Sequence, residues 1–290
     1  MIKQTDSHAK GIGFILISAF FYGSYGVWSR LMASSFGEFS QAWTRGLLLM
    51  IVILLLNFKL RILKPIRRQD LPWFVIIGLA GGLNQAPYYF GFKHLSIGTA
   101  TLLFYAALVI AGYLIGKIAF NEKLTRIKII SLILALLGMI IIYKFTLVPD
   151  QFLAAGFTIL AGLMGGCSAV LPKKLSGTYK ELQIMLSYFI VMVMANSILS
   201  IIFHDPLPSY KETSVWLAQI GYAVAMLVAN WSVIEGFKHI EASVGSLIGL
   251  AEIIFGIGFG IILFGESMTI GVVFGAGLII ISAALPNLIE

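Results

Sequence analysis

One glutamate lies within an otherwise apolar stretch near the carboxyl end of the sequence. Glu252 is preceded by Gly245 and Gly249 and followed by Gly256 and Gly260, at separations of 4, 3, 4 and 4 residues. This spacing places all five residues on one stripe of a helix. If the stretch crosses a membrane, an ionised carboxylate at its centre costs about 2.5 to 3.5 kcal/mol, so we expect Glu252 to face protein or a cavity. It could be a packing carboxylate, or it could exchange a proton or bind a substrate.

Amide side chains occur at two further places in apolar surroundings. Asn84 and Gln85 belong to "NQAPYY", where Pro87 removes a backbone donor and predicts a kink in a helix. Asn230 lies 145 residues after Gln85. These amides could hydrogen-bond to a neighbouring helix or to a substrate.

Arg45 and three aromatic residues complete the candidate set. Arg45 could extend to the lipid headgroups, or it could complement an anionic substrate group or a carboxylate. Tyr22, Tyr105 and Trp231 are candidates for the wall of a cavity, where they could stack on a ring or a cation. The four histidines lie at the ends of apolar stretches without metal-ligand spacing, so we expect no metal site and no cofactor.

Membrane spans are the elements that must position these side chains. Hydrophobic residues make up 59% of the 290 residues, which is more apolar surface than a soluble core could bury. A helix needs about 20 apolar residues to cross a bilayer. Ten such runs occur, at residues 11–33, 39–58, 71–91, 96–119, 127–145, 152–172, 182–203, 213–235, 243–264 and 269–287. The sequence therefore predicts an all-α polytopic membrane protein with ten transmembrane helices.

The basic residues predict the orientation of these helices. With the N-terminus inside, the outside loops carry Arg30, Lys93, Lys144 and Lys211. The inside loops then carry Lys3, Lys10, Lys59, Arg61, Lys64, Arg67, Arg68, Lys123, Arg126, Lys128, Lys173, Lys174, Lys180 and Lys238. Because basic residues gather in cytoplasmic loops, we expect a multi-pass protein of the cell (inner) membrane with both termini in the cytoplasm. The net charge of +7 is thereby explained without a nucleic-acid partner.

A repeated phrase divides the chain into two halves. "GFKH" occurs at residues 91–94 and again at 236–239, and it begins the match of "GFKHLSIGTATLL" with "GFKHIEASVGSLI". After a one-residue gap, Asn121-Glu122 falls over Gly265-Glu266. "GSYGVWSR" in the first span likewise matches "GCSAVLPK" in the sixth.

Two halves of five helices each explain these matches. Because five is odd, the two halves have opposite orientations in the membrane, which is a common architecture of secondary transporters. We predict a first repeat at residues 1–147 and a second, inverted repeat at residues 148–290.

The chain resembles ten-helix members of the drug/metabolite transporter superfamily, whose paired halves are of EamA type. The resemblance is carried by "FYGSYGVWSR" in the first span, by Arg45 in the second, and by a small-residue helix that ends in Glu before a further helix, as in "IAFNEKLT" and "ILFGESMT". It covers essentially the whole chain. The fourth and ninth spans of this family often carry a central proline, where this chain has Val109 and Ile253.

The resemblance implies transport of small organic molecules such as amino acids, other metabolites or drugs. The sequence contains no GxxxxGK[ST] loop, in agreement with a transporter that hydrolyses no nucleotide. We expect a monomeric secondary transporter that exports metabolites by alternating access, with a small-molecule substrate and the lipid bilayer as partners and protons as the candidate coupling ion.

A drug or organic-cation extruder of the same fold is the alternative function. An intramembrane enzyme is disfavoured, because neither a carboxylate pair nor a nucleophile with its base is found, and no catalytic residue is expected. The candidate coupling or charge residues are Glu252 and Arg45. The candidate substrate-binding residues are Tyr22, Asn84, Gln85, Tyr105, Asn230 and Trp231.

Overall fold

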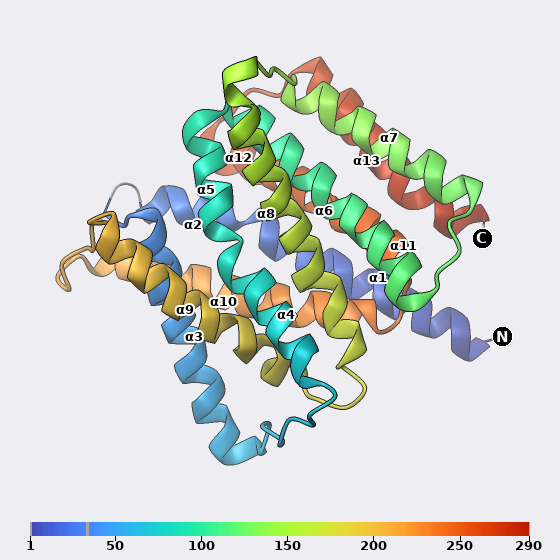
Figure 1. Cartoon of the computed structure of the whole chain (residues 1–290). Helices are drawn as coiled ribbons and strands as arrows, with labels where there is room; N and C mark the ends of the chain where they lie inside the picture. The colour runs from blue at the N-terminus through green and yellow to red at the C-terminus, as the bar shows by residue number, and fades with distance from the viewer. Residues whose placement is uncertain (1, 33–34, 290) are drawn as a thin grey trace.

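The computed structural model describes the backbone of residues 2–32 and 35–289 and the side chains of residues 7–32 and 35–288. All helices and no strand make up the regular secondary structure of this part of the chain (Figure 1). The helices are α1 (Ile2–Gly23), α2 (Tyr25–Met32), α3 (Glu38–Leu60), α4 (Leu71–Leu83), α5 (Gln85–His94), α6 (Ile97–Phe120), α7 (Arg126–Tyr143), α8 (Phe152–Val170), α9 (Glu181–Ile202), α10 (Thr213–Phe237), α11 (Ala242–Gly249), α12 (Ala251–Phe264) and α13 (Ile270–Ile289). Short 3-10 turns occur at Pro149–Gln151 and Leu171–Lys174.

Nine stretches of the described residues are long and apolar enough to cross a membrane, and they match every predicted span except the third. The third span consists of α4 and α5, which meet at Asn84. The kink expected from Pro87 is therefore present, because the proline ring conflicts with the carbonyl of Leu83 four residues earlier. The two short helices follow one another through the bundle and provide the tenth crossing (Figure 1).

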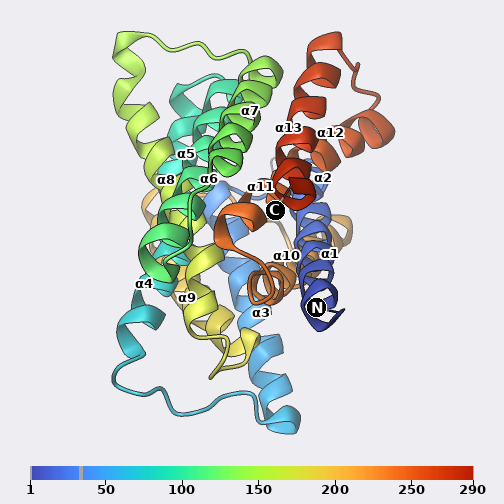
Figure 2. The same cartoon turned by 90° about the vertical axis from the view of Figure 1, so that its right-hand side faces the viewer.

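Loop contacts place both termini and the second "GFKH" at one end of the bundle, which we call the inner end. His8 Nε2 lies 2.8 Å from Asn287 Oδ1, so the first helix meets the last. Ser7 Oγ lies 3.0 Å from Nδ1 of His239, the last residue of the second "GFKH". Lys238, its neighbour, pairs with Glu181 at the start of α9. Figure 2 shows the N- and C-termini on the same side of the molecule.

The first "GFKH" lies at the opposite end, which we call the outer end. Gln151 Nε2 donates to the carbonyl oxygen of His94 at 3.1 Å. Thr99 Oγ1 donates to the carbonyl oxygen of Thr146 at 2.8 Å. The two copies of the phrase are therefore on opposite ends of the bundle, and the two five-helix repeats have inverted orientations, as predicted.

The packing of the first helix in each half follows the same inverted symmetry. A Cβ atom added at Gly23 of α1 would meet the carbonyl oxygen of Glu252 and Cβ of Phe255 on α12. A Cβ atom added at Gly166 of α8, the residue aligned with Gly23, would meet the aligned positions on α6, Leu108 and Ala111. Small residues permit this close approach of helices. The fifth and tenth spans, α7 and α13, pack directly against each other in both views (Figures 1 and 2).

Three spans are interrupted within the bundle: α1 and α2 meet at Ser24, α4 and α5 at Asn84, and α11 and α12 at Leu250. At the last break, Leu250 N donates to Leu247 O at 3.1 Å, and Ile253 N donates to Leu250 O at 3.0 Å. The ninth span is thus broken without a proline, whereas α6, with Val109, is continuous. Interrupted helices at this depth are typical of substrate sites in transporters.

Candidate functional site

A hydrogen bond joins the sixth and twelfth helices in the interior of the bundle. Tyr105 Oη on α6 donates to the carboxylate of Glu252, which is half-buried in the first turn of α12. Two of the candidate residues, one from each half of the chain, are therefore in direct contact. The carboxylate has a protein partner, and it retains acceptor capacity for a second donor.

Gly249 precedes Glu252 by three residues, at the end of α11. Apart from its chain neighbours and the backbone of its own helix, no atom of the described residues lies within 4 Å of the position that a Cβ at Gly249 would take. In the alignment of the two halves, Gly249 corresponds to Tyr105, and Glu252 corresponds to Leu108. The carboxylate and its tyrosine partner therefore both occur where the sequences of the two repeats differ.

A second contact joins Tyr22 at the end of α1 to Asn230 of α10. Tyr22 Oη donates to Asn230 Oδ1 at 3.0 Å, and Asn230 Nδ2 donates to the carbonyl oxygen of Met226 at 2.8 Å. The amide of Asn230 is thereby fixed. The structure again brings together two candidate residues from opposite halves.

The amides of the third span are in a different position. Gln85 aligns with Asn230, but the residue aligned with Tyr22 is Gly165, which has no side chain to offer. Asn84 and Gln85 are half-buried, and their side-chain amides have no hydrogen-bond partner among the described residues. They are therefore the amides with free donors and acceptors near the break between α4 and α5.

Arg45 is buried, with an exposed fraction of 3%, so it does not extend to the headgroups. Its Nη1 donates to Gln41 Oε1 at 3.3 Å, and its guanidinium carbon lies 3.7 Å from the ring centroid of Tyr222. Its Nε has no partner among the described residues. A desolvated cation over an aromatic ring is stabilised by about 2 kcal/mol or more.

A series of tyrosine rings connects Arg45 to the amide contact. The ring of Tyr222 lies 4.6 Å from that of Tyr25, and Tyr25 lies 5.3 Å from Tyr22. Sequence reasoning missed Tyr222, although its spacing of eight residues from Asn230 places both on one face of α10 and could have identified it.

Trp231 is not part of this group. It is exposed on α10, and its ring packs edge-on against Phe14 of α1 at 5.5 Å. Among the described residues no group of three His, Cys, Asp or Glu side chains could hold a metal ion.

The arrangement can bind a cationic or hydrogen-bonding small molecule. Glu252 supplies a carboxylate, tyrosine rings supply faces that attract cations, and the amides of Asn84 and Gln85 supply free hydrogen-bonding groups. Glu252, Tyr22 and the two amides each lie at a helix break or within two residues of one.

Comparisons with known proteins agree with this arrangement. The model of the EamA-like transporter family matches the chain twice, over residues 9–144 and 152–288. A protein of Helicobacter pylori (strain J99) described as an uncharacterized transporter is 22% identical over 292 residues, which cover 97% of this chain and 96% of that protein. An uncharacterized transporter of Clostridium kluyveri is 23% identical and covers 95% of this chain and 92% of its own length.

A solved structure, described only as the crystal structure of a protein, shares the fold. It superimposes with a TM-score of 0.81 at 13% identity and covers 98% of this chain and 97% of its own. At this level of identity the likeness concerns the fold alone.

Proposed function

Because this chain belongs to the EamA-like transporter family, we propose that it is a secondary transporter that exports small organic metabolites, amino acids or related compounds, by alternating access. The observation that carries the proposal is the hydrogen bond between Tyr105 and Glu252, which joins the two repeats in the interior of the bundle. We place the protein in the cell membrane as a monomer, with the inner end in the cytoplasm and the repeats at residues 1–147 and 148–290. Family membership favours a transporter over an enzyme.

The substrate class follows from the chemistry of the side chains. The ammonium group of an amino compound would pair with the carboxylate of Glu252, which has acceptor capacity beyond its bond with Tyr105. The free amides of Asn84 and Gln85 would donate to a carboxylate or hydroxyl of the same molecule. An amino acid or a related amine satisfies both groups.

Coupling would come from competition at one carboxylate. Glu252 cannot bind a proton and an ammonium group at the same time. When the substrate dissociates from the carboxylate on one side of the membrane, a proton can therefore bind in its place. A carboxylate within the membrane is a typical element of such proton relays. A proton gradient directed inward would then drive the amine outward.

A second function has an observation in its favour. The tyrosines near Glu252 and the stacked pair of Tyr88 and Phe104, with ring centroids 4.1 Å apart, offer several aromatic faces. Aromatic faces with a nearby carboxylate also suit bulky organic cations, as in a drug extruder of the same fold.

Thermal stabilisation of the purified protein separates these functions. A ligand that binds only the folded state raises the free energy of unfolding, by about 2.7 kcal/mol at a ligand concentration of 100 times its Kd. The melting temperature rises accordingly. We expect amino acids or small amines to stabilise the parent protein but not Glu252→Gln. Stabilisation by bulky quaternary cations alone would favour the extruder, and stabilisation by compounds without an amine would contradict the role of Glu252.

The proposed orientation has its own test. An accessibility tag beside Lys93 should be labelled from outside intact cells, and one beside Lys238 only after the cytoplasmic face is opened. The reverse pattern would invert the assignment of the two ends.

A further inference from the structure

The fourth and ninth spans end in the same local structure. The residue before Glu122 and the residue before Glu266 have left-handed backbone conformations, with φ of 54° and 66°. Glu122 N donates to the carbonyl oxygen of Gly116 at 2.9 Å, and Glu266 N donates to that of Gly260 at 3.2 Å. A Cβ atom at either glycine would collide with the carboxylate of the glutamate in its own half. Each glutamate is therefore folded back on the end of its own helix.

Each of these glutamates forms an ion pair with a basic residue, and the two basic residues occupy aligned positions in the two repeats. Lys173 Nζ lies 3.4 Å from Glu122 Oε1, and Arg30 pairs with Glu266. Arg30 aligns with Lys173, as Glu266 does with Glu122. The two ion pairs are thus related by the inverted symmetry, one at the inner end and one at the outer end.

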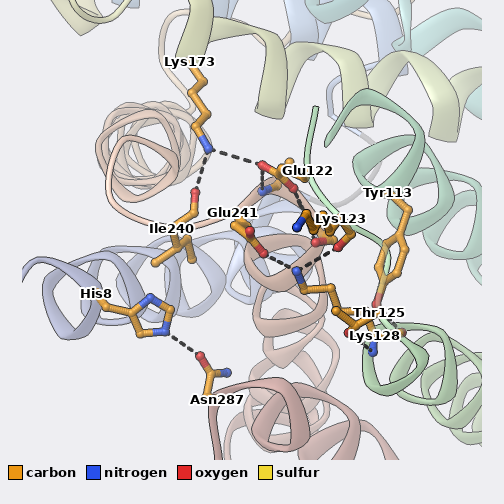
Figure 3. A network of polar contacts seen from close by, with 12 residues as sticks. His8, Tyr113, Glu122, Lys123, Thr125, Lys128, Lys173, Ile240, Glu241 and Asn287 are labelled. Carbon is orange, nitrogen blue, oxygen red and sulfur yellow. Dashed lines mark hydrogen bonds and ion pairs between the residues drawn. The ribbon is translucent and has the colours of Figure 1, made fainter. Parts of the chain in front are cut away.

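The inner pair is closed over the start of α11. The Glu122 side chain is only 6% exposed, and its carboxylate accepts from Ala242 N at 2.7 Å and from Ser243 N at 3.3 Å (Figure 3). A helix N-terminus stabilises an anion at this position. Lys173 Nζ also donates to the carbonyl oxygen of Ile240 at 2.9 Å, so the pair holds the end of α6 against the start of α11.

The outer pair is formed, but it does not close over the start of a helix, and we call this form open. The Glu266 side chain is 46% exposed. The positions aligned with Ala242 and Ser243 are Ile97 and Gly98 at the start of α6, and Ile97 is 74% exposed whereas Ala242 is fully buried. Beside the outer pair is a cavity of about 110 Å³ between α2 and α12, lined in part by Arg30, Gly256 and Glu266.

We propose that the two ion pairs are the alternating gates of this protein, and that Glu266 caps the start of α6 at Ile97 and Gly98 when the outer end closes. Glu122 would then leave the start of α11, and the inner pair would take the open form that the outer pair has here. This inference rests on the proposed transport by alternating access. Because each state replaces one set of contacts by its symmetry equivalent, the two states can be close in free energy.

One additional contact biases this exchange towards the state seen here. Lys128 pairs with Glu241 at the inner end (Figure 3). The aligned positions at the outer end are Val272 and Ser96, which cannot form an ion pair. Closure of the inner end therefore has a contact that closure of the outer end lacks.

Cysteine labelling tests the exchange without any substrate. In a Cys167→Ala background in lipid nanodiscs, Ala242→Cys and Ile97→Cys are labelled separately with a membrane-impermeant maleimide. Removing the charge of Glu122 with Glu122→Gln should raise the labelling rate at position 242 by about tenfold, the change expected for loss of a carboxylate at a helix N-terminus. The same variant should lower the rate at position 97, because the outer end closes as the inner end opens.

Glu266→Gln is the reciprocal variant and should leave position 97 labelled as fast as in the parent or faster. Asp150→Asn, in the outer loop before α8, is the matched control and should change neither rate. If Glu122→Gln raises the rate at position 242 but leaves that at position 97 unchanged, Glu122 is a local helix cap and the exchange is refuted. Should that variant fail to fold, Lys173→Gln gives the same two readings.

Failure of the gates and failure of the proposed substrate class are distinguishable. The labelling rates report the exchange even when no amine stabilises the protein. If an amine stabilises the protein but Glu122→Gln changes the labelling rate at position 242 without changing that at position 97, the proposed substrate class stands and the proposed gates are wrong.

Discussion

The hydroxyl of Tyr105 on α6 donates a hydrogen bond to the carboxylate of Glu252 on α12, and the two residues come from opposite repeats. Towards the inner end, α6 packs against α11, where a Cβ atom added at Gly112 would collide with Ser246. The position aligned with Gly112 is Gly256, whose nearest neighbour is Gly23 of α1 and not α6. The α6 helix thus packs closely against α11 and diverges from α12, and the hydrogen bond between Tyr105 and Glu252 lies where the divergence begins. A substrate bound at Glu252 can therefore respond to a movement of the ninth span relative to α6.

Tyr105→Phe should lower both transport and thermal stability. The substitution keeps the ring and removes the donor to Glu252, and a hydrogen bond to a charged group contributes about 1.5 to 3 kcal/mol. We expect substrate flux in proteoliposomes to fall by about tenfold, and the melting temperature to fall because the carboxylate of Glu252 loses its donor. Tyr210→Phe, at an exposed tyrosine of an outer loop, is the control. Equal flux in the two variants would remove Tyr105 from the site.

Gly249→Leu should block substrate binding without disturbing the fold. The new side chain would lie one turn before Glu252, where we propose that substrate binds, and an added Cβ there meets no atom within 4 Å beyond its chain neighbours and its own helix backbone. Gly277→Leu places the same side chain at an equally open glycine of α13 and serves as the control. We expect stabilisation by substrate to be lost in the first variant alone. A Gly249→Leu protein that is still stabilised would show that substrate does not bind there.

Arg45→Lys should destabilise the protein although it keeps the charge. Lysine lacks the planar guanidinium that lies over Tyr222, and that contact is buried. For a contact of about 2 kcal/mol, the melting temperature of a protein of this size should fall by roughly 4 to 8 °C. Arg68→Lys, at an exposed loop residue, should leave it unchanged. An unaltered melting temperature in Arg45→Lys would mean that the stacking contributes nothing.

Leucine at the two aligned amide positions should have different effects. Asn230→Leu leaves the hydroxyl of Tyr22 without its acceptor, which costs about 1 to 3 kcal/mol, so its melting temperature should fall. Gln85→Leu breaks no contact among the described residues, so its melting temperature should hold while substrate affinity falls. Thermal unfolding with and without substrate measures both. Equal melting temperatures and equal affinities in the two variants would assign both amides to packing.

Much of the fold could be predicted from the sequence because hydropathy reports span length directly. The charges of the loops and the repeated "GFKH" then predicted the opposite orientations of the halves, which the contacts of His239 and His94 confirm. The break at Asn84 followed from Pro87. The break at Leu250 was not predicted, because no proline marks it and the spacing of Gly249 and Glu252 favours one continuous helical stripe.

The site was less predictable because hydropathy does not fix the rotation of a helix about its axis. Tyr105 and Trp231 are both aromatic residues within spans, yet only the first faces another helix across the interior of the bundle. The ion pairs at the helix ends were missed for another reason. Loop position alone assigns Lys173 and Arg30 to opposite ends of the bundle and does not indicate which carboxylate each contacts, so their pairing with Glu122 and Glu266 is seen only in the structure.

The response of Glu252→Gln to a pH gradient tests the central claim most directly. Glutamine keeps the shape and hydrogen-bonding capacity of the side chain and removes its exchangeable charge. In proteoliposomes loaded with the amine that stabilises the parent protein, the proposed coupling predicts that an imposed pH gradient accelerates flux through the parent and not through Glu252→Gln, which should still fold. If the gradient drives flux through both proteins equally, Glu252 is not the coupling residue and its contact with Tyr105 serves packing alone.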